Sequence, residues 1–399
     1  MSERPALEVA DIVRQHGADF LERYGSHVGS GQRRFLRDVE RCRTAALGGH
    51  VERCGDCGQE RIAYNSCRNR HCPKCQGAAR ARWLARETMF LLPVEYHHVV
   101  FTLPAELAGL MLANQRVVYG LLFRAVQDTL LEVAADPHWL GAQPGVLLVL
   151  HTWGQNLHYH PHVHGVVTGG GLSCDVAGRV AEEPGWRACR PGFLLPVRVL
   201  SRVFRGKLLA GLRLAHESGE LVWPEKLTSL ADESVFQRWL TPLYQKDWVV
   251  YAKPPFGGPE QVLKYLARYT HRVAISNQRL LSLENGQVTF RYKDYTEANR
   301  AKTLTLTADE FLRRLVLHVL PRGFVKIRHY GLLANRRRAL RLEQARRLLL
   351  LVTVACQFTA APSPERDKPA CPFCGSVRLE RVALPRDLAP TPVPAANTS

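Results

Sequence analysis

The chain has 399 residues, of which 54 are Lys or Arg and 36 are Asp or Glu, giving a formal net charge of +18. This excess predicts binding to a polyanion, usually nucleic acid, although a basic surface without a ligand would give the same total. A hydrophobic content of 46% is enough for a core. The sequence has no run of about eighteen apolar residues and no basic amphipathic helix, which argues against a membrane protein.

The 11 cysteines are interpreted through the expected compartment. The first residues, Met-Ser-Glu-Arg-Pro, lack the apolar region of a signal peptide, so we expect a cytoplasmic protein. In a reducing cytoplasm, cysteines are metal ligands or buried thiols rather than disulfides.

The predicted elements begin with helices over 8–47, where apolar residues recur at three-and-four spacing. A Gly- and Cys-rich segment over 48–77 should depend on metal for its fold, and a basic helix follows over 78–92. An irregular segment is expected over 172–197, and disorder over 361–370 and 384–399. Strands are predicted over 97–103, 146–153, 162–168, 247–252, 273–277, 279–283 and 287–292, the last two joined by an Asn285-Gly286 turn. Further helices are predicted over 105–135, 199–216, 259–271, 308–319 and 333–356.

Four histidines alternate within residues 156–165, NLHYHPHVHG. Residues two apart on a strand point to the same face, so His162 and His164 present neighbouring imidazoles. The pattern favours a divalent metal over a structural role, and imidazole alone indicates zinc, copper, iron or nickel. A third ligand is not obvious from the sequence, and Gln155 and His160 rank first.

Residues 264–272, KYLARYTHR, place Tyr265 and Tyr269 on one face of a predicted helix, one turn apart. Two half-buried core aromatics would give the same spacing. Beside a His-x-His strand in a basic chain, we favour nucleophiles, because a tyrosine hydroxyl can attack a phosphodiester and form a phosphotyrosine. The ordinary tyrosine pKa of about 10 means that ionisation needs help. That help would come from the metal or from Lys253, Lys264, Arg268 or His271.

These motifs resemble a known family. HPHVHGVVTGGG followed by YLARYTHR resembles the two-tyrosine rolling-circle insertion-sequence transposases, the group typified by insertion sequence 91 within the HUH endonucleases. NSCRNRHCPKCQ at 65–76 resembles the zinc-binding region that precedes the nuclease in this family. VVFTLP at 99–104 resembles the first-strand motif of rolling-circle initiators, and LPRGFVKIRHYGLLANRRR at 320–338 resembles the downstream segment. The resemblance covers roughly residues 35–340.

The resemblance implies an α+β fold, with a HUH nuclease built on a central antiparallel sheet flanked by helices, as in RNA-recognition-motif-like nucleases. It implies catalytic Mg²⁺ or Mn²⁺ at His162 and His164, and Tyr265 and Tyr269 as nucleophiles. The substrates would be single-stranded DNA at the element ends and the target, in the nucleoid of a bacterium, with possible self-association.

Four regions are expected along the chain. N-terminal helices and a zinc-binding, DNA-binding domain occupy 1–92, and the nuclease occupies 93–300. A basic helical DNA-contact region follows over 301–360, and a disordered tail with a CxxC knuckle over 361–399.

The cysteine spacing predicts structural zinc. Cys54-x-x-Cys57 and Cys72-x-x-Cys75 form two knuckles, and four thiolates at this spacing are typical of one zinc site. Cys371-x-x-Cys374 is a single knuckle, for which Cys356 is a candidate partner. The residues left over near the first knuckles would suit a second zinc, or would simply surround one site; they are Cys42, His50, Cys67 and His71.

Two basic stretches are candidate DNA contacts, although a charge run can also be a solvated face. Residues 61–86 contain no acid, and residues 313–347 contain one, Glu343. Phosphate contacts of this kind supply affinity that depends steeply on salt. His329 and Tyr330 are candidates for stacking on bases. The selected basic residues are Arg68, Arg70, Lys74, Arg80, Arg336, Arg337 and Arg338.

Three alternative functions stay open. A plasmid rolling-circle replication initiator or a relaxase would share the nuclease motif. A non-catalytic zinc-dependent DNA-binding regulator would explain the charge and the cysteines, but would leave the histidine strand and the tyrosines unused. A histidine-metal hydrolase that uses activated water would need neither tyrosine.

Overall fold

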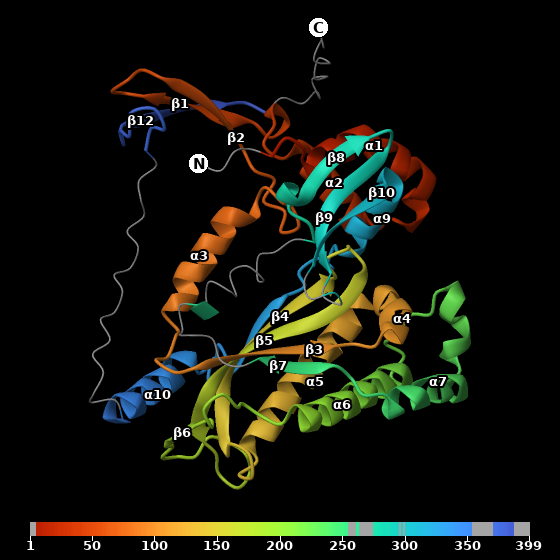
Figure 1. The fold of residues 1–399 in the computed structure, drawn as a ribbon, viewed down its shortest axis with the longest axis vertical. Helices are drawn as coiled ribbons and strands as arrows, with labels where there is room; N and C mark the ends of the chain where they lie inside the picture. The colour runs from red at the N-terminus through yellow and green to blue at the C-terminus, as the bar shows by residue number, and fades with distance from the viewer. Residues whose placement is uncertain are drawn as a thin grey trace. The chain divides into compact units, whose positions relative to one another are not determined.

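The computed structural model describes residues 5–253, 261–262, 274–294, 297, 300–352 and 370–386. The described elements form an α+β protein with antiparallel sheets, as predicted (Figure 1). The chain divides into two compact units, each made of segments that are distant in sequence. Unit 1 contains residues 1–80, 271–319 and 360–399, and unit 2 contains residues 81–270 and 320–359. No helix in the described ranges is long and apolar enough to cross a bilayer.

Unit 1 combines helices with two small antiparallel sheets, in the strand orders β12-β1-β2 and β10-β9-β8. Its helices are α1 (Val9–Tyr24), α2 (Ser30–Arg41) and α9 (Ala308–Leu317), with short 3₁₀ turns at Gly25–His27, Ala45–Leu47 and Asn277–Arg279. Its strands are β1 (Gly49–Cys54), β2 (Glu60–Tyr64), β8 (Leu280–Glu284), β9 (Gln287–Asp294), β10 (Arg300–Thr307) and β12 (Leu379–Leu384).

Contacts between sequence-distant segments hold unit 1 together. Arg23 at the end of α1 pairs with Asp309 on α9 at 2.8 Å, and the Gln32 amide donates to the carbonyl of Val316 at 2.9 Å. The side-chain oxygen of Asn277 accepts a hydrogen bond from the backbone N–H of Val9. The N-terminal helices therefore fold together with residues some 270 positions later in the chain.

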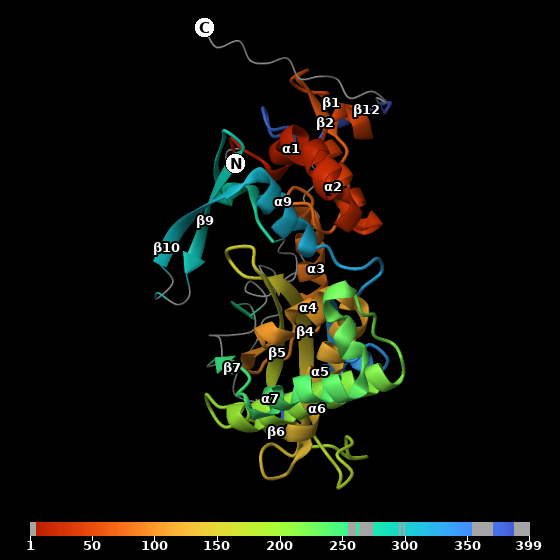
Figure 2. The same cartoon turned by 90° about the vertical axis from the view of Figure 1, so that its right-hand side faces the viewer.

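Unit 2 is a six-stranded sheet in the order β11-β4-β5-β3-β7, with β6 paired to β5, and helices pack on it (Figure 2). Its helices are α4 (Ala108–Ala113), α5 (Gln115–Ala135), α6 (Val197–Glu217), α7 (Glu233–Gln245) and α10 (Arg338–Val352), with 3₁₀ turns at Ala105–Leu107 and Glu225–Ala231. Its strands are β3 (Tyr96–Thr102), β4 (Ala142–Trp153), β5 (Tyr159–Ser173), β6 (Trp186–Ala188), β7 (Val250–Lys253) and β11 (Ile327–Gly331). The boundary between the units falls within α3 (Gln76–Thr88).

Alternation along the central strands gives the sheet of unit 2 two different faces. Phe101 on β3 and Val163 on β5 point to one face, into a core that contains buried residues of α5 and α6 such as Phe123 and Phe204. Residues of the other parity, including Val149, point to the opposite face beside Trp83 of α3. This second face carries the histidines.

The structure corrects several predicted elements. The strand predicted over 273–277 is not formed over 274–277, where Asn277 begins a 3₁₀ turn and anchors α1 instead. The region predicted as basic and helical over 301–360 contains strand β10 and strand β11. Part of the tail predicted to be disordered forms β12, because it pairs with β1 from Gly49↔Leu384 to Cys54↔Leu379. Helix α7 was not predicted.

Candidate metal centres and basic surfaces

Three histidines meet on the second face of the sheet in unit 2. In the ladder between β4 and β5, His151 lies opposite His162, and Val149 lies opposite His164. Because residues two apart on a strand share a face, this register puts His151 beside both members of the His-x-His pair. One nitrogen from each ring lies within 4.8 Å of the others.

The histidine cluster is tightly packed and mostly buried. The Nε2 atoms of His162 and His164 lie 3.0 Å apart, and the ring centroids of His151 and His164 lie 4.5 Å apart. His151 is 3% exposed and His164 is 7% exposed. Two ring nitrogens this close either share one proton in a hydrogen bond or direct their lone pairs at a common cation.

Hydrogen bonds outside the cluster orient its rings. The Nδ1 of His162 donates to the backbone carbonyl of His160 at 2.7 Å, which leaves Nε2 available as a ligand. The Nδ1 of His164 lies 2.9 Å from Nε2 of His98, which is also buried. Burial lowers the pKa of His162 to about 4, so the ring is neutral near pH 7, as a metal ligand must be.

The donor set suits a divalent transition metal. Three neutral imidazoles are borderline ligands that suit Zn²⁺, Cu²⁺, Fe²⁺ or Ni²⁺, whereas Mg²⁺ and Mn²⁺ more often take oxygen ligands. The described residues bring His151 into the group and leave out His160, one of the two predicted third ligands. The ring centroid of His160 lies 5.3 Å from that of His162. Burial lowers the pKa of His160. The other candidate, Gln155, lies in the turn between β4 and β5 and stays a prediction.

The predicted nucleophiles, Tyr265 and Tyr269, lie outside the described residues. Three of the residues that were predicted to help them ionise, Lys264, Arg268 and His271, also lie outside the described residues. The fourth, Lys253, is the last residue of β7, and only its backbone is described. The tyrosine assignment therefore stays a prediction from the sequence.

In unit 1, one group of four cysteines joins the end of α2 to the loop before α3. Its members are Cys42, Cys67, Cys72 and Cys75. Cys75 Sγ lies 3.4 Å from Cys42 Sγ and 3.5 Å from Cys67 Sγ. Hydrogen bonding to Cys67 lowers the pKa of Cys42 to about 7, which favours the thiolate that zinc requires.

A second group in unit 1 joins the two ends of the chain. It consists of Cys54, Cys57, Cys371 and Cys374, with Sγ–Sγ distances of 3.5 Å between Cys54 and Cys374 and 3.7 Å between Cys57 and Cys371. A hydrogen bond from the backbone of Cys57 is the largest cause that lowers the pKa of Cys54, to about 6. The pairing of β1 with β12 holds the two knuckles together.

The predicted zinc grouping was therefore wrong in its pairing. Cys54 and Cys57 do not share a site with Cys72 and Cys75, because β12 brings the C-terminal knuckle to β1. The two histidines of the predicted second site belong to neither group. His50 bonds the buried carboxylate of Glu52 at 3.2 Å, and His71 packs edge-on against Phe35. Cys356, the candidate partner of the C-terminal knuckle, lies outside the described residues.

The selected basic residues differ in what they contact. Lys74 forms a nearly buried ion pair with Glu8 at 2.7 Å, which gives it a structural role in unit 1. Arg68 and Arg80 are exposed, and Arg70 is half-buried, which lowers its pKa. In unit 2, the guanidinium of Arg338 stacks on Phe90 at 3.7 Å. Arg336 and Arg337 line a cleft.

The two predicted stacking residues lie on β11. His329 pairs with the buried carboxylate of Glu87 at 3.0 Å, and Tyr330 is half-buried, with its pKa raised by that burial. Both side chains thus already pack within unit 2.

Comparison with known proteins identifies the family. Residues 145–340 match the family model described as "Putative transposase", and residues 12–103 match the model described as "Transposase zinc-binding domain". The latter match and the cysteine groups together indicate structural zinc. No solved structure matches the chain significantly.

Two curated relatives cover most of the chain. "Putative transposase y4qJ" of Sinorhizobium fredii is 53% identical over 365 residues, which is 92% of this chain and 90% of that protein. "Transposase for insertion sequence element IS801" of Pseudomonas savastanoi pv. phaseolicola is 30% identical over 313 residues, which is 75% of this chain and 72% of that protein. The chain therefore belongs to the family of insertion sequence 91-type transposases with an N-terminal zinc-binding domain.

Proposed function

We propose that this transposase cuts and rejoins single-stranded DNA at element ends through 5′-phosphotyrosine intermediates, and so drives rolling-circle transposition. The observation that carries the proposal is the group of three buried or half-buried imidazoles on the β4–β5 ladder. Helices α5 and α6 pack on one face of the antiparallel sheet and the imidazoles of the His-x-His pair lie on the other, an arrangement that fits an HUH nuclease.

The chemistry needs a nucleophile, a polarised phosphate and a protonated leaving group. The Oη of Tyr265 or Tyr269 attacks the phosphorus and loses its proton, a new P–O bond forms, and the P–O3′ bond breaks. The tyrosine stays joined to the 5′-phosphate, and the 3′ oxygen leaves as a hydroxyl after taking a proton. A divalent ion held by His151, His162 and His164 would polarise the scissile phosphate and stabilise the charge on the leaving oxygen.

Two tyrosines serve a strand exchange better than one. The first phosphotyrosine conserves the energy of the broken phosphodiester, so a free 3′-hydroxyl can later reverse the reaction and rejoin DNA without an external energy source. A second tyrosine then cuts another strand while the first end stays covalently held. The excess positive charge of the chain supplies affinity for both strands.

The test is a search for a covalent adduct. The protein is incubated with Mn²⁺ and single-stranded oligonucleotides that carry the element ends, and the products are separated under denaturing conditions. The wild type should give a protein–DNA adduct, and the Tyr265→Phe, Tyr269→Phe double variant should give none. An adduct that persists in the double variant, or a wild type that cuts without an adduct, would contradict the tyrosine mechanism.

One observation favours a second candidate. Three imidazoles are also a ligand set of zinc enzymes, in which a metal-bound water is the nucleophile. A water mechanism would release a free 5′-phosphate and would need neither tyrosine. Hydrolysis in H₂¹⁸O separates the two, because only direct attack by water puts the label on the 5′-phosphate during the first cut.

A further inference from the structure

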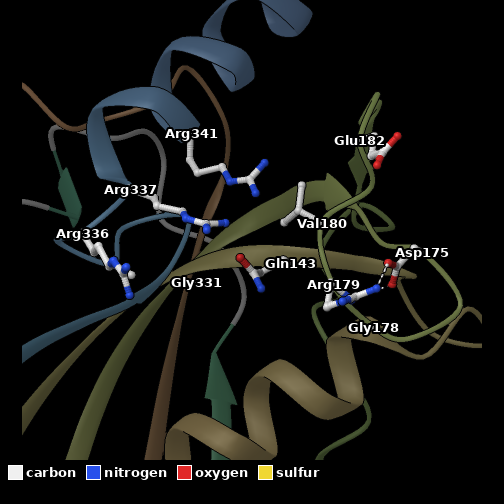
Figure 3. A pocket seen from close by; sticks show the side chains of 11 residues that line it. Gln143, Asp175, Gly178, Arg179, Val180, Glu182, Gly331, Arg336, Arg337 and Arg341 are labelled. Atoms are coloured by element: carbon white, nitrogen blue, oxygen red, sulfur yellow. Dashed lines mark hydrogen bonds and ion pairs between the residues drawn. The ribbon is translucent and has the colours of Figure 1, made fainter.

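A cleft of about 630 Å³ opens in unit 2, away from the histidine group. Its walls come from the start of β4, the loop after β5 and the segment from the end of β11 into α10. Figure 3 shows the guanidinium groups of Arg337 and Arg341 directed into the space above Gln143. The charged residues that line it are Arg179, Arg336, Arg337, Arg341, Asp175 and Glu182.

The charge of this cleft is positive and largely unbalanced. Arg179 pairs with Asp175 at 3.3 Å, so this arginine and this acid offset each other. Glu182 is exposed, and in Figure 3 its carboxylate points away from Arg337 and Arg341. Within the described ranges, neither Arg336 nor Arg337 makes an ion pair with a carboxylate, and the guanidinium of Arg341 donates only to the neutral amide of Gln344, at 3.1 Å.

Two like charges are held close together in the cleft. Partial burial, and secondarily the positive charge of Arg337, lowers the pKa of Arg341 from its ordinary value. The backbone keeps them adjacent, because the N–H of Arg341 donates to the carbonyl of Arg337 at 3.0 Å. A guanidinium fork matches two phosphate oxygens, so an anion shared by the two groups would offset this repulsion.

The cleft lies at the opposite end of the strands from the histidine group. Gln143 is near the start of β4 and His151 is near its end, eight residues later. At roughly 3.3 Å per residue, that separation is about 26 Å along the strand. Duplex DNA advances about 3.4 Å per base-pair step, so about eight steps would connect the two places.

We propose that this arginine-lined cleft is a second DNA site, which binds backbone phosphates of the element end about 26 Å from the scissile phosphate. The proposal rests on the proposed function, because the histidine group defines where the scissile phosphate lies. Arg337 and Arg341 hold the phosphates, and Arg336 adds positive charge to the lining. Such contacts fix the register of the DNA on the protein without reading bases.

The test compares equilibrium binding of short and long oligonucleotides without added divalent metal, so that it does not depend on cleavage. Short oligonucleotides cover only the cleavage position, and long ones extend beyond about 26 Å as either single strand or duplex. Arg337→Ala, Arg341→Ala should weaken binding of long DNA roughly tenfold or more and leave short DNA unchanged. The salt slope should fall by about 1.4 for a single strand or about 1.8 for a duplex.

The control variant is Arg198→Ala, Arg202→Ala, which removes the same charge from exposed positions on α6 outside the cleft. It should bind long DNA as the wild type does. A loss confined to the duplex or to the single strand supports the cleft and identifies which form occupies it. Unchanged binding of long DNA by the cleft variant, or an equal loss for short and long DNA, would overturn the proposal.

Two further measurements separate causes of failure. Arg337→Lys, Arg341→Lys keeps the charge but loses the guanidinium fork, so it should recover part of the binding, whereas a misfolded variant would recover none. Adduct formation on short oligonucleotides reports on the tyrosine chemistry alone. If no adduct forms, the proposed function is contradicted, and the cleft is still tested by the binding measurements.

Discussion

His98 on β3 and His164 on β5 share a buried hydrogen bond of 2.9 Å between Nε2 of the first ring and Nδ1 of the second. The rings are almost parallel, at 12°. With Nδ1 of His164 engaged in this bond, its Nε2 faces the Nε2 of His162 at 3.0 Å. His98 is thus a positioning residue that sets the tautomer and the orientation of one proposed metal ligand.

His98→Ala should weaken metal binding without removing a ligand. The loss of an outer hydrogen bond typically lowers metal affinity by about 10- to 100-fold. The Mn²⁺ concentration that gives half-maximal adduct formation should rise by that factor, while the rate at saturating Mn²⁺ falls much less. His97→Ala removes a buried histidine of opposite parity on the same strand and should leave the Mn²⁺ dependence unchanged. Equal effects of the two variants would indicate that His98 only supports packing.

His151→Ala should abolish adduct formation as completely as His162→Ala or His164→Ala, because each removes one of three grouped ligands. His160→Ala should retain activity within a few-fold, since its backbone carbonyl, which accepts from His162, is kept. Gel-based counting of adducts over a series of Mn²⁺ concentrations distinguishes these outcomes. If His160→Ala is inactive and His151→Ala is active, the third ligand is His160, one of the two candidates ranked first from the sequence.

The sequence was informative where a pattern is local. Alternation marked His162 and His164 as neighbours on a strand, and the apolar runs predicted β3 to within one residue at each end. They predicted the existence of β4 and β5 but made both strands too short. His151 was missed because it ends an apolar run in a different strand. Only the register His151↔His162 brings it to the pair, and the pairing register is not written in either strand alone.

Long-range pairing also explains the error in the cysteines. Two CxxC knuckles close together in sequence suggested one site, but β12, more than 300 residues after β1, pairs with β1. This pairing brings Cys371 and Cys374, which directly precede β12, to Cys54 and Cys57. The arginine cleft has the same origin, because Arg179 and Arg337 come from separate segments. The run of basic residues in the sequence predicted the positive charge of the cleft. It could not predict that Arg338, next to Arg337, stacks on Phe90 and does not line the cleft.

The two cysteine groups predict two zinc ions per chain. Cys371→Ser, Cys374→Ser should reduce the zinc content to one and release β12 from β1, because thiolate coordination and strand pairing stabilise each other there. Cys67→Ser, Cys72→Ser should remove the other ion. Atomic emission on the purified protein gives the stoichiometry, and limited proteolysis reports on the freed segment.

Cys174→Ser is the matched control for the zinc measurement, since Cys174 is half-buried and belongs to neither group. It should leave two ions bound. A wild type that holds a single zinc, or a Cys371→Ser, Cys374→Ser variant that holds two, would show that the C-terminal knuckle is not a ligand pair.

Gly331 at the end of β11 shapes the chain that leads to the arginine cleft. Its φ is +58°, and a Cβ there would lie 1.9 Å from the carbonyl oxygen of Pro144. Gly331→Ala therefore adds a backbone clash to the cost of a left-handed conformation, and should lower the free energy of unfolding by roughly 3 kcal/mol or more. Gly323→Ala has φ +75° with open space around the new methyl group, so it should cost only about 1 kcal/mol.

Comparing the free energies of unfolding of Gly331→Ala and Gly323→Ala in urea separates the cost of the steric clash from the cost of the left-handed backbone conformation. The backbone N–H of Leu332 donates to the same Pro144 carbonyl at 3.1 Å, so relieving the clash in Gly331→Ala would also break this bond and displace the segment that carries Arg337. The variant should then bind long DNA less tightly than Gly323→Ala does, at a temperature where both are folded. Equal unfolding midpoints for the two variants would mean that the segment relaxes freely and that Gly331 does not position the cleft.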